Sequence, residues 1–301
     1  MARRCAAEPL VEELIDELTW DAPLRLFGGV HYLELAGLEP YALSGDWDDF
    51  RSALESRRDF LARFVREQAV QTNEVQRCWA LLPAFLWLAR EHGGALDLLE
   101  LGPSAGLNLL WDRYGYVYRA GRWGASELNL RGIEYAPVPF DVLARRVDVR
   151  RRVGIDLAPV DVTGEHGSRL LNAFIWPGRV ERAQRLRQAI SILRRDPPEL
   201  VRGDYVELLP SLLAERDDEA LTVVFQTAST GYIGAERRAE LRSLLEDAGR
   251  DGPLGWVSTR AVEELEEDRH DSYELEVALW PGGERRFLLR CDFHGRWLRW
   301  R

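Results

Sequence analysis

The 301-residue sequence contains no lysine and only three cysteines. Cys5, Cys78 and Cys291 are odd in number and far apart, which excludes a disulfide framework and favours reduced thiols in a cytoplasmic protein. Cys291 and His294 have a metal-ligand spacing, but no second ligand pair accompanies them, so we expect no metal site. All 40 basic residues are arginines, a usage that indicates a GC-rich bacterial genome and implies no particular chemistry.

Long hydrophobic runs and an excess of positive charge are also missing. The most apolar run, 81–89, contains Pro83 and is too short to cross a bilayer. The first residues include Arg3 and Arg4 and no apolar stretch, so we expect no signal peptide. Fifty acidic residues give a net charge of -10, which argues against a clamp on duplex DNA. We therefore expect neither a membrane nor a nucleic-acid partner.

The first ninety or so residues have the pattern of helices. Apolar residues recur at helical spacing within 10–18, 50–69 and 75–89. Asn73 suits the start of the third helix and Gly93 its end. We therefore expect a helical N-terminal region over residues 1–94.

Strands and helices alternate from residue 95 onward. Short apolar strands are expected at 96–101, 152–156, 200–202, 221–225 and 254–258, with helices at 105–113, 180–193, 206–213 and 235–248. A closing hairpin is expected at 273–293. This alternation predicts an α/β domain over 95–301, whose sheet is mostly parallel with one reversed strand.

Residues 114–150 interrupt the alternation. The segments 116–119 and 127–133 are rich in strand-forming residues, and glycines lie between them at 121–124. We expect these two segments to pair as a small β-hairpin insertion.

The clearest motif is the stretch from Leu98 to Asn108, in which a strand runs into a small-residue turn and then a helix. Glycines allow the backbone to approach a ligand closely, and amides at the start of a helix attract anionic groups. An acid at the end of the strand, Glu100, suits a cationic or hydroxylated group. A plain tight turn remains the structural alternative.

Two more acids follow the next core strands. Asp156 comes at the end of the strand 152–156, and Asp204 follows the strand 200–202. With Glu100 they would line one crevice at the carboxyl ends of the strands, where open α/β sheets bind ligands. Each of the two could instead cap a helix.

The order of elements and these motifs resemble the class I S-adenosylmethionine-dependent methyltransferases. The resemblance implies a Rossmann-like methyltransferase sheet that binds S-adenosylmethionine. The residues it implies for the cofactor are Glu100, Gly102, Ser104, Gly106, Asn108, Asp156 for the ribose and Asp204 near the adenine. Methyl transfer to a small-molecule substrate is then expected, with region 1–94 as a lid or substrate wall. Candidates to face the methyl acceptor are Asn73, Glu74 and Gln226.

A narrower resemblance covers most of the chain. The stretches 71–75, 104–114, 154–163 and 175–177 are similar to an uncharacterised bacterial family defined only as a domain of unknown function. Three features depart from the methyltransferase pattern. Ser104 replaces the usual middle glycine, Asp156 lies farther after Glu100 than a ribose-binding acid usually does, a distance that the insertion 114–150 would absorb, and the Asn-Pro-Pro-Tyr motif of amino-group methylation is missing after Phe225. The first and third departures leave open a methyltransferase-like scaffold that binds a ligand without catalysis.

A serine hydrolase is the second alternative. Residues 102–106 satisfy G-x-S-x-G, the turn that carries the nucleophile of α/β-hydrolases. Ser104 would be the nucleophile, His294 the base, and Asp204 or Asp271 the acid. Against this reading, the elbow normally follows several strands, whereas the segment before Ser104 is expected to be helical.

Overall fold

A computed structural model describes residues 2–15, 19–217, 219–261 and 272–301. The chain forms two compact units. Residues 1–72 and 161–190 form the first, the helical unit, and residues 73–160 and 191–301 form the second, the sheet unit. The expected boundary after residue 94 differs from this division, because the helix before the first strand belongs with the sheet and a later segment joins the N-terminal helices.

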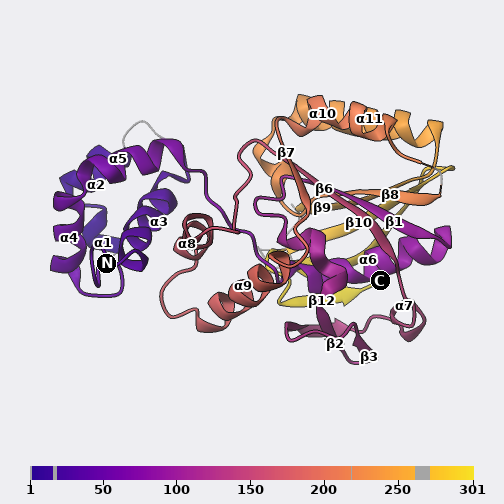
Figure 1. Ribbon diagram of the computed structural model, residues 1–301, viewed down its shortest axis with the longest axis horizontal. Helices are drawn as coiled ribbons and strands as arrows, with labels where there is room; N and C mark the ends of the chain where they lie inside the picture. The colour runs from indigo at the N-terminus through magenta and orange to yellow at the C-terminus, as the bar shows by residue number, and fades with distance from the viewer. Residues whose placement is uncertain (1, 16–18, 218, 262–271) are drawn as a thin grey trace. The chain divides into compact units, whose positions relative to one another are not determined.

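The helical unit is built on short helices around one apolar core. In order these are α1 (Ala2–Cys5), α2 (Pro9–Ile15), α3 (Ala22–Leu35), α4 (Trp47–Ser56), α5 (Arg58–Glu67), α8 (Glu165–Ala173) and the first part of α9 (Val180–Leu193) (Figure 1). Asp46 caps α4 by accepting hydrogen bonds from the amides of Asp48 and Asp49. Helix α3, which the spacing did not predict, contacts both α5 and α8.

Two histidines attach α8 to α3. His31 contacts the carbonyl of Ala173 through Nδ1 at 3.1 Å, and the hydroxyl of Tyr32 lies 2.8 Å from Nδ1 of His166. Burial lowers the pKa of His31, which favours a neutral ring there. These side chains explain why residues 161–190 pack with the N-terminal helices.

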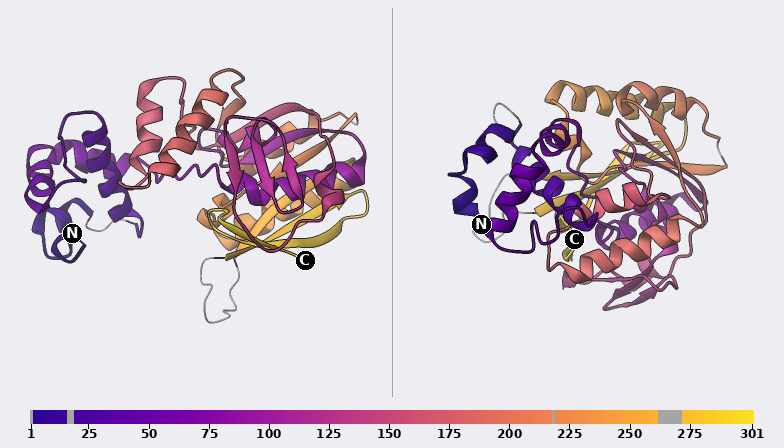
Figure 2. Two further views of the ribbon diagram at one scale, coloured as in Figure 1. Left: turned by 90° about the horizontal axis from the view of Figure 1, so that it is seen from below. Right: turned by 60° about the vertical axis from the view of Figure 1, so that its left-hand side comes forward.

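The sheet unit contains a nine-stranded sheet in the order β5-β12-β11-β10-β9-β8-β1-β6-β7. The strands are β1 (Ala95–Leu101), β5 (Ile133–Ala136), β6 (Val149–Asp156), β7 (Glu199–Arg202), β8 (Ala220–Phe225), β9 (Leu254–Ala261), β10 (Ser272–Trp280), β11 (Glu284–Asp292) and β12 (Trp297–Trp300). Strand β1 is central, parallel to β6 and β8 on its two sides. Figure 2 shows the strands β9 to β12 continuing this sheet.

The expectation of one reversed strand is wrong. Of the nine described strands, β10, β12 and β5 run against β1. The chain passes from β9 through β10 and β11 to β12 as an antiparallel meander, so each step reverses direction. The insertion then adds β5 parallel to β12 at the sheet edge. The large α/β sheet that the sequence predicted is confirmed at this coarser level.

Helices cover both faces of the sheet. Helices α10 (Tyr205–Ala214) and α11 (Ala235–Asp251) lie over one face (Figure 1), where Leu99, Leu101 and Val153 join their core. Helix α6 (Arg77–His92) packs against β9 and β10 on the other face and ends at Gly93, whose φ of 83° is left-handed. Alternate residues of β1 therefore face opposite layers.

The insertion differs from the expected hairpin. Strand β2 (Gly115–Tyr118) pairs antiparallel with β3 (Gly121–Trp123) and parallel with β4 (Asn129–Arg131). The tight turn therefore lies just after Tyr118, before the glycines that suggested it. Gly124 lies so close to the carbonyl of Tyr114 that a Cβ there would be 2.2 Å from its oxygen. Glycine at this position thus lets the chain run close to the start of β2 and form β4 on the side of β2 opposite β3. Helix α7 (Phe140–Leu143) completes the insertion.

The segment after β1 is a 3-10 helix, η1 (Leu107–Arg113), and not the expected α-helix. Hydrogen bonds that span three residues, such as Leu109 N to Gly106 O at 3.2 Å, produce the tighter winding. In the part of the chain that the structure describes, no helix is long and apolar enough to cross a membrane. Within the same residues, no group of three or more histidine, cysteine, aspartate or glutamate side chains could hold a metal ion.

Candidate functional site

The loop after β1 has left-handed backbone at three alternating positions. The φ angles are 71° at Gly102, 57° at Ser104 and 79° at Gly106. Glycine adopts this conformation readily, whereas for serine it costs free energy. Ser104 thus has a backbone conformation that glycine adopts more readily than serine.

Asp156 stabilises this conformation from the end of the neighbouring strand. Its Oδ2 accepts a hydrogen bond from the Ser104 amide at 2.8 Å, and its Oδ1 accepts one from the Ala158 amide at 2.9 Å. The Ser104 carbonyl in turn accepts from the amide of Val160 at 3.1 Å. The side chain is half-buried. Asp156 therefore joins the loop to the end of β6 and caps no helix.

The space next to the loop glycines is occupied by protein atoms. A Cβ on Gly102 would lie 2.4 Å from the Cβ of Ser229, whose hydroxyl donates to the Leu101 carbonyl at 2.6 Å. A Cβ on Gly106 would lie 2.9 Å from Cγ of Pro198. These glycines are thus required by internal packing, whether or not a ligand approaches the loop.

Glu100 is the most unusual residue at this edge. Only 1% of its surface is exposed, and its Oε1 accepts one long hydrogen bond, 3.5 Å, from Asn108. Its Oε2 is buried without a hydrogen-bond partner among the described residues. Burial raises the pKa of Glu100 to about 8, helped by the charge of Asp156 and opposed by Asn108 and Arg77. An unpartnered buried carboxylate costs free energy, so such a group calls for a function.

Two residues of the α6 side complete the surroundings of Glu100. The thiol of Cys78 donates to Oδ1 of Asn108 at 3.2 Å, which orients the amide toward Glu100. Burial raises the pKa of Cys78, so it remains a thiol. Oδ1 of Asn73 accepts from the Leu107 amide at 3.4 Å. The helical spacing of Cys78 in the sequence indicated only a buried position and gave no signal of this contact with Asn108.

Asp204 is engaged in local structure. It caps α10 by accepting from the Val206 amide at 2.7 Å, and it pairs with Arg237 of α11 at 2.7 Å. Burial opposes ionisation, but the hydrogen bonds from Arg237 and Val206 outweigh it and lower the pKa of Asp204. Both carboxylate oxygens thus bind protein groups. Of the three predicted acids, only Glu100 has an oxygen without such a partner.

The candidate acceptor residues also have local partners. Gln226 is buried at the end of β8, and its Oε1 accepts from the indole of Trp256 at 3.3 Å. Glu74 is buried, and its Oε1 accepts from the Gln76 amide at 3.1 Å. The structure thus brings Glu100, Asn108, Asn73 and Asp156 together around the loop. Gln226 follows Phe225, the β8 residue that pairs with Glu100, and its side chain accepts from Trp256, while that of Glu74 accepts from the Gln76 amide.

The hydrolase residues are distributed differently. The positive φ of Ser104 fits a strained nucleophile turn. Its proposed acid Asp204, however, is held by the amide of Val206 and by Arg237. Asp271 lies outside the described residues. His294, the proposed base, lies in the turn between β11 and β12.

Comparison with known proteins gives a family and no activity. No curated protein matches the chain. A family model described as "Uncharacterized protein conserved in bacteria (DUF2332)" matches residues 2–300. Because the match covers nearly the whole sequence, the chain belongs to this bacterial family of uncharacterised proteins.

Proposed function

We propose that the chain binds S-adenosylmethionine at the carboxyl edge of the sheet and transfers its methyl group to a small molecule. The observation that carries this proposal is Oε2 of Glu100, which is buried and unpartnered beside a loop with three left-handed residues. A ligand at this oxygen would supply the interaction that the described protein does not.

The chemistry of the cofactor suits Glu100. S-adenosylmethionine carries a methyl group on a positively charged sulfur and, in the same molecule, an ammonium group. A cation within hydrogen-bond distance favours the ionised carboxylate and would lower the pKa of Glu100 from about 8. Asn108 would hold Oε1 meanwhile, as it does here.

Asp156 remains suited to a ribose even though it supports the loop. Each carboxylate oxygen can accept more than one hydrogen bond, and those of Asp156 each accept one from an amide. Further lone pairs are therefore available for ribose hydroxyls. Asp204 is less suited, because Arg237 and Val206 already bind its two oxygens.

The proposed reaction needs positioning more than it needs a base. A methyl donor and acceptor held in line gain rate from alignment and from the exclusion of water. Asn73, which contacts the loop through Leu107, is the candidate acceptor residue with a direct connection to this site. Gln226 and Glu74 remain further candidates.

Calorimetry with S-adenosylhomocysteine tests the proposal. We expect one site per chain, and Glu100→Gln should weaken binding by about tenfold or more, the value of a charge-assisted hydrogen bond. Glu134→Gln is the matched control: Glu134 is also buried, but its two oxygens accept from the amides of Arg119 and Val138. This control should leave the affinity unchanged.

Three outcomes separate the alternatives. Absence of binding up to about 1 mM, the weak end of specific affinity, overturns the proposal. Binding without a methylated product from a panel of small acceptors indicates a ligand-binding scaffold. Covalent labelling of Ser104 by a fluorophosphonate indicates the hydrolase, and we expect no labelling.

A further inference from the structure

A cavity lies at the opposite, amino edge of the sheet, under the end of α10. Its volume is about 260 Å³, close to the ~300 Å³ at which small-molecule sites begin. Its apolar lining includes Leu99 and Val153, which are paired neighbours on β1 and β6, and Leu212 of α10. Thr222 is the uncharged polar residue in the described lining.

A β-bulge shapes the rim of this cavity. Leu96 pairs with Val149 and Asp97 pairs with Arg151, so Arg150 is an extra residue without a partner on β1. Bulges redirect a side chain and recur beside functional sites. Here the bulge allows Arg150 to reach Asp97 with two hydrogen bonds, of 3.2 Å from Nε and 2.7 Å from Nη2.

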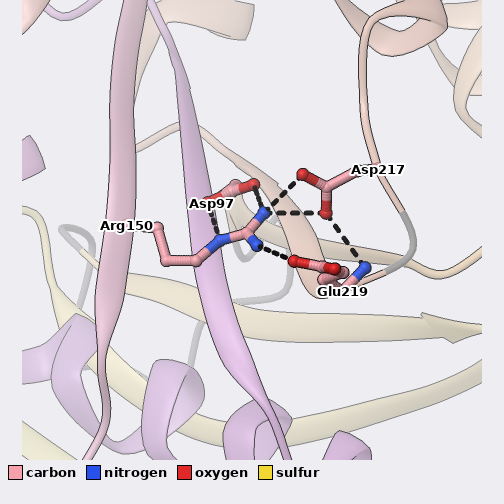
Figure 3. Close-up of polar contacts among 4 residues, drawn as sticks. All are labelled: Asp97, Arg150, Asp217 and Glu219. Atoms are coloured by element: carbon pink, nitrogen blue, oxygen red, sulfur yellow. Dashed lines mark hydrogen bonds and ion pairs between the residues drawn. The ribbon is translucent and has the colours of Figure 1, made fainter.

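Arg150 also binds the loop between α10 and β8 (Figure 3). Its Nη2 donates to both oxygens of Asp217 at 2.8 and 2.9 Å, and its Nη1 donates to Glu219 at 3.4 Å. Hydrogen bonds to Asp97 and Asp217 raise the pKa of Arg150 further above its ordinary value. Asp97 and Asp217 of the cavity are thus both hydrogen-bonded to one fixed guanidinium, and Glu215, the third acid of the described lining, lies 3.6 Å from Arg151.

Two other arginines in the lining retain unused donors. Arg216 is half-buried and donates to the carbonyl of Ala248 at 2.6 Å. Within the described residues no carboxylate lies at ion-pair distance from it. Arg151 lies 3.6 Å from Glu199 and from Glu215, an ion-pair distance too long for a hydrogen bond. A guanidinium has five N–H donors, so both side chains can still bind an anion.

We propose that this cavity binds a small organic carboxylate whose apolar body lies on Leu99, Val153 and Leu212 and whose carboxylate pairs with Arg216. A planar guanidinium recognises a carboxylate in bidentate fashion. The three acids of the described lining already have arginine partners, Arg150 for Asp97 and Asp217 and Arg151 for Glu215, whereas Arg216 pairs with no carboxylate among the described residues and favours an anion. The site is independent of the proposed methyltransferase activity, since it lies at the other end of β1.

Calorimetry on the full chain with sodium benzoate tests this site, with benzylamine and benzyl alcohol as cationic and neutral analogues. We expect one benzoate per chain with a dissociation constant of about 1 mM or below, since small ligands gain limited free energy. Benzylamine and benzyl alcohol should bind at least tenfold more weakly. Diffraction from crystals soaked in 4-bromobenzoate should show an anomalous bromine signal in the cavity.

Two variants test the assignment. Arg216→Gln should weaken benzoate binding at least tenfold, while Arg187→Gln, an equal charge change at an exposed position of α9, should not. Leu212→Trp should block the cavity and abolish binding, which tests the site even if Arg216→Gln fails to fold. Equal binding of the three probes, unchanged affinity in a folded Arg216→Gln, or a bromine signal elsewhere overturns the proposal.

Discussion

Strand β1 carries two acids, three positions apart, whose surroundings are opposite. Near the amino edge, Asp97 is bound by two hydrogen bonds from Arg150. At the carboxyl edge, Glu100 is almost fully buried, has one long hydrogen bond from Asn108 and leaves Oε2 without a described partner. The same strand thus presents a satisfied carboxylate on the α10 side and an unsatisfied one on the α6 side.

The difference distinguishes an acid that stabilises the fold, Asp97, from an acid that can bind a ligand, Glu100. The pairing of Asp97 with Arg150 fixes the rim of the amino-edge cavity, and neither group is left for a ligand (Figure 3). Glu100 is held in place by Asn108 without an ion-pair partner among the described residues, and burial therefore raises its pKa. At the ends of β1, a carboxyl oxygen without a hydrogen-bond partner indicates where a ligand would bind, whereas an acidic residue by itself does not.

The largest expected effect is the pH dependence that Glu100 gives to stability. Its pKa rises from the ordinary 4.5 to about 8 on folding, so between these values the folded protein holds a proton that the unfolded chain has lost. Its contribution to the free energy of unfolding should fall by about 1.4 kcal/mol per pH unit across this range. Urea unfolding at several pH values should show this slope in the parent and a much smaller one in Glu100→Gln.

The control for this experiment is Glu134→Gln, which removes a buried glutamate whose oxygens are both hydrogen-bonded. It should keep the slope of the parent. If the free energy of unfolding has the same pH slope in the parent and in Glu100→Gln, Glu100 is ionised in the folded protein. That result would contradict the proposed difference between Asp97 and Glu100.

Asp156 should give the next largest effect. If its carboxylate holds ribose hydroxyls, Asp156→Ala should cost roughly 2–4 kcal/mol of affinity for S-adenosylhomocysteine, or about thirty-fold or more. It should also lower stability by roughly 1–3 kcal/mol, because the amides of Ser104 and Ala158 lose their acceptor. Calorimetry and thermal unfolding of the same variant measure both.

Asp204→Ala is the comparison for that variant. Loss of the cap on α10 should lower stability by about 1 kcal/mol with a smaller change in affinity. Affinity equal to the parent in Asp156→Ala would remove the ribose assignment and leave Asp156 as a support for the loop.

A smaller effect is expected at the amino edge. Arg150→Gln leaves Asp97, Asp217 and Glu219 without their shared cation, so the melting temperature should fall by a few degrees. Added salt should reduce the difference, because these groups are partly exposed and screened. A melting temperature as high as that of Arg187→Gln at low salt would show that the network does not stabilise this edge.

The smallest effect concerns the backbone of Ser104. Ser104→Gly should change stability by about 0.5 kcal/mol in the favourable direction, because relief of the left-handed conformation exceeds the entropy that glycine loses. Ser104→Val should instead lose about 1–2 kcal/mol, since a β-branched side chain resists this φ. Chemical denaturation compares the two, and the reverse order would contradict the loop conformation.

Local patterns predicted much of the secondary structure. The apolar strand 96–101 and the strand 221–225 are β1 and β8, and Gly93 ends α6 as its position suggested. Helix α3 escaped prediction because it is buried on most sides, with Gly28 and Gly29 packed against Phe174 and Phe64, so it lacks a polar face with helical period.

By itself the sequence determined the core strands, several of the helices, the α/β class and the acids at the strand ends, because periodicity, glycine and strand propensity act within a few residues. Only the tertiary structure decided the three reversed strands, the grouping of 161–190 with the N-terminal helices, and the partners of each acid. Whether a carboxylate is satisfied depends on side chains distant in sequence, such as Arg237 for Asp204 and Arg150 for Asp97. For that reason Glu100, Asp156 and Asp204 were equivalent in the sequence and differ in the folded protein.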